Sequence, residues 1–78
     1  MRDLLLNVLT DIRPEFDFSL SKDFLADGLL DSFDLILLVS NLDKKFAISI
    51  EAQEITPENF LNLETLEKLL KKYTEKKQ

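Results

Sequence analysis

A chain of 78 residues with 45% hydrophobic and 32% charged residues has the composition of one small folded domain. It contains no cysteine and no histidine, which excludes a disulfide framework, a thiolate metal site and histidine-dependent catalysis. Residues 1–58 carry twelve acidic and five basic side chains, a net charge of −7, so we expect basic protein partners and no binding to nucleic acid.

The first predicted helix covers residues 1–12. Apolar side chains recur there at steps of three and four, which places them on one helical face: Met1, Leu4, Leu5, Val8, Leu9 and Ile12. The helix must end before Pro14, because the residue that precedes a proline is displaced from the α region. Residues 14–31 lack this pattern and predict a long ordered loop, held to the core by Phe16, Phe18, Leu20 and Phe24.

The second predicted helix runs from Ser32 to Phe46. Asp31 or Ser32 is expected to be its N-cap, and Asp34 in the first turn suits the positive end of the helix dipole. The face predicted to be buried carries Leu35, Leu38, Val39, Leu42 and Phe46. The opposite face carries Phe33 and Leu37, two large apolar residues with no place in this core, which indicates contact with another molecule.

A second loop is predicted over residues 47–55, with Ile48 and Ile50 turned inward. The Thr-Pro-Glu sequence that follows has the order of an N-cap, a first helical residue and a first-turn acid. We therefore predict a short helix of one or two turns over residues 56–60.

The last predicted helix begins after Asn62, its expected N-cap, and keeps the three-four apolar spacing up to Tyr73. Residues 74–78 are expected to fray. The predicted fold is therefore all-α, with three main helices, one short helix and a long loop after the first helix, in a single domain over residues 1–78.

No apolar run approaches the roughly 20 residues that a membrane-spanning helix needs. The first residues also lack the pattern of a signal peptide. We therefore expect no membrane insertion and a cytoplasmic location.

The acidic residues of the stretch 23–34 resemble part of an EF-hand calcium loop. Positions 1, 5, 6, 9 and 12 of such a loop would be Asp23, Asp27, Gly28, Asp31 and Asp34. Position 3 would be Leu25, which has no oxygen to offer, and position 12 lacks the bidentate glutamate. A degenerate calcium loop over residues 23–34 is therefore one hypothesis, which we place third, after the two described below.

Ser32 stands at the start of a helix, where a phosphoryl group would meet the positive end of the helix dipole. Serine and aspartate are also favoured N-caps, so these residues by themselves are typical of a plain cap as well as of a modification site. No base that could activate Ser32 is evident in the sequence. We therefore do not expect an enzyme.

Three segments together resemble the acyl carrier proteins and the related peptidyl and D-alanyl carriers. They are Asp-Gly-Leu-Leu-Asp-Ser-Phe-Asp at 27–34, the apolar helix that ends at Phe46, and Ile-Thr-Pro-Glu-Asn-Phe at 55–60. The resemblance implies a four-helix bundle in which Ser32 bears 4′-phosphopantetheine, taken from coenzyme A by a separate magnesium-dependent transferase. An acyl or aminoacyl group would be held as a thioester on the thiol of this arm.

The resemblance agrees with the residues in two respects. A borrowed thiol would supply the group that a chain without cysteine lacks. Phe33 and Leu37, beside Asp31 and Asp34, form an apolar anchor with an acidic rim, which suits a reversible contact with partner enzymes. The implied partners are a phosphopantetheinyl transferase, an acyl- or aminoacyl-activating ligase and downstream acyl-transfer enzymes. The carrier itself is expected to be non-catalytic and monomeric.

Departures from the fatty-acid carriers concern the second helix. Leu37, Lys44 and Lys45 stand where acids are common in those carriers, and Phe33 replaces their usual leucine or methionine. The Gly-Leu-Leu-Asp-Ser-Phe and Pro-Glu-Asn-Phe runs more closely resemble free-standing carriers that work with an adenylating ligase, such as aminoacyl carriers, D-alanyl carriers or carriers in specialised biosynthesis. The alternative from another class is an unmodified helical interaction module that binds a partner through the Phe33 and Leu37 face.

Overall fold

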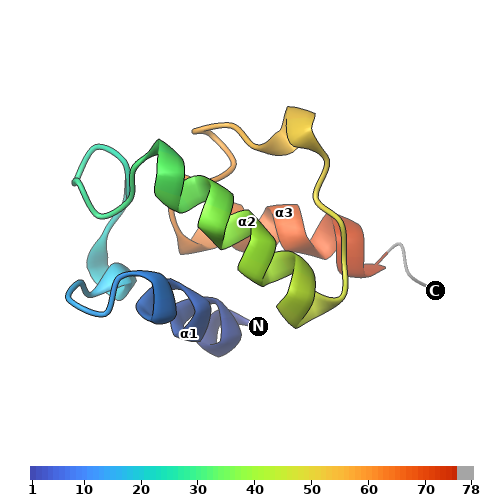
Figure 1. Cartoon of the computed structure of the whole chain (residues 1–78), viewed down its shortest axis with the longest axis horizontal. Helices are drawn as coiled ribbons and strands as arrows, with labels where there is room; N and C mark the ends of the chain where they lie inside the picture. Colours follow the sequence, from blue (N-terminus) through green and yellow to red (C-terminus); the bar gives the residue numbers. More distant parts are fainter. Residues whose placement is uncertain (76–78) are drawn as a thin grey trace.

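The computed structural model describes residues 1–75, and they form a bundle of three α-helices (Figure 1). These are α1 (Arg2–Ile12), α2 (Ser32–Phe46) and α3 (Leu63–Glu75), with the short 3-10 helices η1 (Phe18–Leu20) and η2 (Ala52–Glu54) in the two connecting loops. The prediction of an all-α fold is confirmed. No helix in the described part of the chain is long and apolar enough to cross a membrane.

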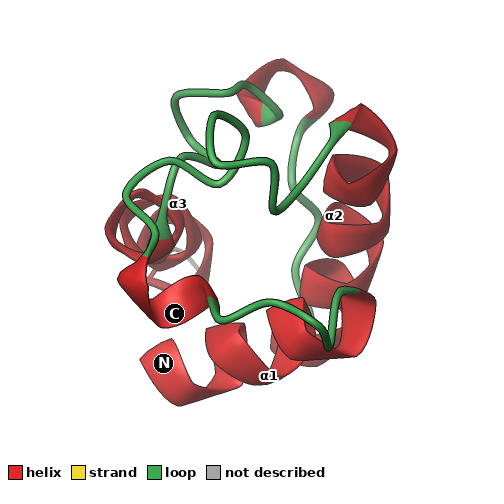
Figure 2. Ribbon diagram, turned by 90° about the vertical axis from the view of Figure 1, so that its left-hand side faces the viewer, coloured by secondary structure: helices red, strands yellow, loops and turns green. Residues whose placement is uncertain are grey.

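Helix α2 is central in the view of Figure 1, with α1 below it and α3 behind it. The first loop gathers at the end where α2 begins, and the second loop runs from the other end of α2 back to the start of α3. Figure 2 shows the helices around the interior, with the loops closing one side. All three α-helices contribute leucine side chains to one continuous buried cluster.

Both loops contribute aromatic side chains to this core. Phe18 and Phe24 of the first loop and Phe60 of the second are fully buried. Phe18 meets Phe24 edge to face, with ring centroids 5.3 Å apart, a geometry that aromatic pairs prefer. The prediction that Leu20 also holds the loop is wrong: 83% of its surface is exposed. A 3-10 helix has three residues per turn, so Leu20, two residues after Phe18, points away from the core.

The predicted short helix over 56–60 is also incorrect. Residues 57–60 form a turn in which the Phe60 N–H donates to the Thr56 carbonyl at 3.2 Å, as in one helical turn. The turn does not continue, because Phe60 enters the core and the Leu61 carbonyl accepts from the Phe24 N–H at 2.7 Å. That bond ties the two loops together and withholds the Leu61 carbonyl from a helix.

Helix α3 begins as predicted, at an N-cap formed by Asn62. The Thr65 N–H donates to Asn62 Oδ1 at 3.0 Å, and the Asn62 N–H donates to Thr65 Oγ1 at 3.1 Å. Of the residues expected to fray, 74 and 75 are the last two of α3, and 76–78 lie outside the described part of the chain.

Near its C-terminal end, α3 holds the second loop. The Glu51 N–H donates to the Tyr73 hydroxyl at 3.0 Å, and Lys72 pairs with Glu54 at 3.2 Å. Burial raises the pKa of the Tyr73 phenol above its usual value. These contacts fix the loop across the side of the bundle opposite α1.

Candidate functional site

A single helical turn leads the chain to α2. Asp23 begins it, because its Oδ1 accepts from the Leu25 and Ala26 N–H groups at 3.1 and 2.9 Å. The turn ends in a Schellman arrangement: the Leu29 N–H donates to the Phe24 carbonyl at 2.9 Å and the Gly28 N–H to the Leu25 carbonyl at 3.1 Å. Gly28 has φ +76°, a conformation that favours glycine, so the single glycine of the sequence turns the chain toward α2.

A capping box built from two aspartates starts α2. The Asp34 N–H donates to Asp31 Oδ1 at 2.9 Å, and the Asp31 N–H donates back to Asp34 Oδ2 at 3.2 Å. Asp31 is therefore the N-cap and Ser32 the first helical residue. Ser32 is exposed, and its hydroxyl makes no hydrogen bond to any residue in the range 1–75. The hydroxyl is held at a fixed place but remains available for reaction.

Asp34 lies inside the protein rather than on the expected contact surface. Only 3% of its surface is exposed, and its Oδ2 accepts from Arg13 Nε at 2.9 Å. The expectation that Asp34 contacts partner enzymes does not fit this position. The reason is that Arg13, which follows the last residue of α1, reaches across to the first turn of α2 and draws the carboxylate inward.

Arg13 is surrounded by carboxylates. Its guanidinium lies 2.9 Å from Asp34, 3.5 Å from Glu15 and 3.7 Å from Asp31. The hydrogen bond and the charge of Asp34, followed by the charges of Glu15 and Asp31, raise the pKa of Arg13 above its usual value. Arg13 was not predicted from the sequence, because nothing in the local pattern links a loop arginine to an aspartate 21 residues further on.

Exposed apolar side chains gather on α2 beside Ser32. Phe33, Ile36 and Leu37 are 67%, 65% and 40% exposed. Their spacing of three and four residues places them on one helical face, and we call this set the α2 apolar patch. Phe33 and Leu37 were predicted to face outward, whereas Ile36 was missed although its spacing matches theirs.

The aspartates of the suspected calcium loop do not converge. Asp23 and Asp31 cap helical turns, Asp27 accepts from the Ser21 hydroxyl at 2.6 Å, and Asp34 is paired with Arg13. The described residues contain no group of three or more acidic side chains placed to hold a metal ion. The geometry therefore gives the calcium hypothesis no support.

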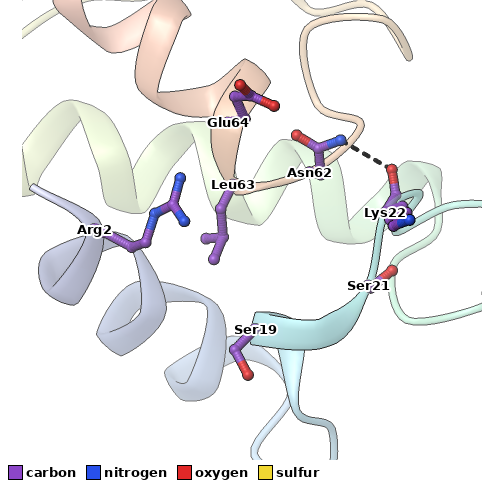
Figure 3. Close-up of a pocket in the computed structure, with 7 residues that line it drawn as sticks. All are labelled: Arg2, Ser19, Ser21, Lys22, Asn62, Leu63 and Glu64. Carbon is purple, nitrogen blue, oxygen red and sulfur yellow. Dashed lines mark hydrogen bonds between the residues drawn. The ribbon is translucent and has the colours of Figure 1, made fainter.

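A pocket of about 310 Å³ lies between the start of α1, the first loop and the start of α3 (Figure 3). None of its lining residues was predicted from the sequence to bind a ligand, although Asn62 was expected to cap α3. Two of its polar side chains are bonded to their neighbours: Asn62 donates to the Lys22 carbonyl at 2.9 Å, and Arg2 pairs with Glu67 of α3. We therefore assign no ligand to this pocket.

Comparison with known proteins shows a similarity to a curated carrier protein. Over 46 residues, 59% of this chain, the sequence is 41% identical to Aminoacyl carrier protein 1 of Bradyrhizobium diazoefficiens. The match covers 51% of that protein, so this chain spans about half the length of the relative. No protein-family model and no solved structure matches the chain.

Proposed function

Because the match to an aminoacyl carrier protein supports a place in the acyl and aminoacyl carrier family, we propose that this chain carries an activated group between enzymes. A 4′-phosphopantetheine arm on Ser32 supplies the thiol that forms the thioester. The name of the relative favours an aminoacyl group as the cargo. The chain itself is the substrate of a phosphopantetheinyl transferase and contributes no catalytic residue.

The observation that carries this proposal is the presentation of Ser32. The preceding turn and the Asp31 cap hold the backbone on its N-terminal side, while its hydroxyl is exposed and makes no hydrogen bond within residues 1–75. A phosphodiester formed there lies at the positive end of the α2 dipole, which tolerates its negative charge. Ser32 alone would hold the arm covalently, so the site needs no enclosed cavity.

The direct test is intact mass spectrometry of the purified protein after incubation with coenzyme A, magnesium and a broad-specificity phosphopantetheinyl transferase. We expect the mass to increase by one phosphopantetheine group, and fragmentation to place it on Ser32. A mass that does not change with any of several transferases would contradict the carrier function. That result would favour the interaction module, which needs the α2 apolar patch but no arm.

We further propose that the transferase and the loading ligase bind the α2 apolar patch. Phe33 follows the modified serine directly, and Asp31 adds an exposed carboxylate at the edge of the patch. An aromatic anchor with a polar rim is typical of the residues that dominate small interfaces. A basic surface on the partner would match the net charge of −5 of the chain.

Phe33→Ala tests this contact. We expect the KM of the transferase for the carrier to rise about tenfold, the effect of removing one anchoring side chain. The kcat of the transferase and the melting temperature of the carrier are expected to stay close to the wild-type values, because Phe33 is largely exposed. Leu20→Ala is the control, since Leu20 is also exposed but belongs to η1. An unchanged KM for Phe33→Ala, or an equal rise for both variants, would exclude the patch as the contact.

A further inference from the structure

One arginine links the end of α1 to the residues on both sides of Ser32. Arg13 Nε and Nη2 both lie 2.9 Å from Asp34 Oδ2, the oxygen that also accepts from the Asp31 N–H at 3.2 Å. Asp31 immediately precedes Ser32, and Asp34 follows it by two residues. The position of Arg13 is itself fixed, because its N–H donates to the Leu9 carbonyl of α1 at 2.9 Å and Pro14 follows it.

We propose that Arg13 is a positioning residue for the attachment of phosphopantetheine to Ser32. This inference rests on the proposed carrier function. Arg13 holds the Asp34 carboxylate in the orientation that fixes the backbone of the N-cap, and the N-cap in turn fixes the start of α2, from which the Ser32 hydroxyl projects. Arg13 acts through Asp34 and does not take part in the chemical step.

The burial of Asp34 makes this arrangement dependent on Arg13. A carboxylate with 3% exposure needs a counter-charge, because water does not stabilise it there. Without the guanidinium, the carboxylate is expected to turn toward solvent and to release the Asp31 N–H. Ser32 would then begin a frayed turn, and its hydroxyl would sample several positions, of which only some suit the transferase.

Arg13 also reduces the negative charge around the modification site. The three carboxylates around Arg13, those of Glu15, Asp31 and Asp34, have a net charge of −2 together with the guanidinium and of −3 without it. Coenzyme A and the phosphodiester product are anionic, so the added negative charge opposes both. Positioning and charge thus act in the same direction, and the two effects are separable by substitution.

The experiment compares Arg13→Gln with Arg13→Lys and with the control Arg2→Gln in transferase kinetics. Arg2→Gln removes the same charge from an exposed pair with Glu67, at the other end of α1. Arg13→Gln is expected to lower kcat at saturating carrier on the order of tenfold. Arg13→Lys keeps the positive charge but not the contact through two guanidinium nitrogens. The kcat with Arg13→Lys is therefore expected to lie between that with Arg13→Gln and that with the wild-type protein. Arg2→Gln is expected to leave kcat unchanged.

A second measurement reports on the site without any loading reaction. Amide hydrogen exchange at Asp31 is expected to become faster in Arg13→Gln, whereas exchange at the buried Leu66 of α3 stays slow if the bundle remains folded. If Arg13→Gln does not fold, Arg13→Lys is used for both measurements, with a smaller decrease in kcat expected.

The possible outcomes are distinct. A lower kcat together with faster exchange at Asp31 supports the inference. A wild-type kcat in Arg13→Gln, or a rise in KM with an unchanged kcat, overturns it while the carrier function stands. Failure of the wild-type protein to accept the arm overturns the carrier function, and the role of Arg13 falls with it.

Discussion

Replacement of Ser32 by alanine is expected to abolish the mass increase that coenzyme A and a phosphopantetheinyl transferase produce in the wild-type protein. The phosphodiester needs a hydroxyl oxygen, and alanine has none. The fold is expected to persist with a change in the free energy of unfolding of about 0.5 kcal/mol or less, because Ser32 is exposed and Asp31, not Ser32, caps α2. Intact mass spectrometry and thermal melting on the same samples measure both effects.

Ser40→Ala is the matched control for this prediction. Ser40 is another exposed serine of α2, two turns further along the helix, and the same hydroxyl is removed. It is expected to accept the arm as the wild-type protein does. Loading of Ser32→Ala, or loss of loading in Ser40→Ala, would show that the arm is attached elsewhere.

The starts of α2 and α3 could be predicted because their signals are local. Asp31 and Asn62 are capping residues that stand directly before a three-four apolar pattern, and both cap as expected. The exposed apolar residues of α2 were evident for the same reason, since helical periodicity assigns a face to each residue. The resemblance to carrier proteins likewise depends on local runs, the one around Ser32 together with the apolar helix up to Phe46 and the segment 55–60.

The parts that failed depend on contacts between segments distant in the sequence. The Thr-Pro-Glu pattern predicts a helix over 56–60, but the bond from Phe24 to Leu61 ends it after one turn. The inward position of Asp34 depends on Arg13, which lies on a different element. Asp34 lies in the first turn of α2, as predicted from the sequence. An acid in that turn is normally exposed, and Asp34 is buried only because Arg13 pairs with it.

Asp34→Ala is expected to be the most destabilising change near the modification site. It leaves the Arg13 guanidinium without its closest partner and the Asp31 N–H without its acceptor. Loss of a buried charged acceptor of this kind costs about 3 kcal/mol, a large part of the stability of a small domain. The melting temperature should fall by on the order of 15 °C, as thermal and denaturant unfolding would show.

Asp27→Ala is the control for the loss of Asp34, because it removes the same charge from the same segment. Asp27 is exposed, and within residues 1–75 its carboxylate accepts only from the Ser21 hydroxyl, at 2.6 Å, so its loss is expected to cost less than about 1 kcal/mol. Similar costs for the two variants would mean that Asp34 gains nothing from burial against Arg13. A much larger cost for Asp34→Ala would show that the carboxylate beside Ser32 is part of the framework that holds the start of α2.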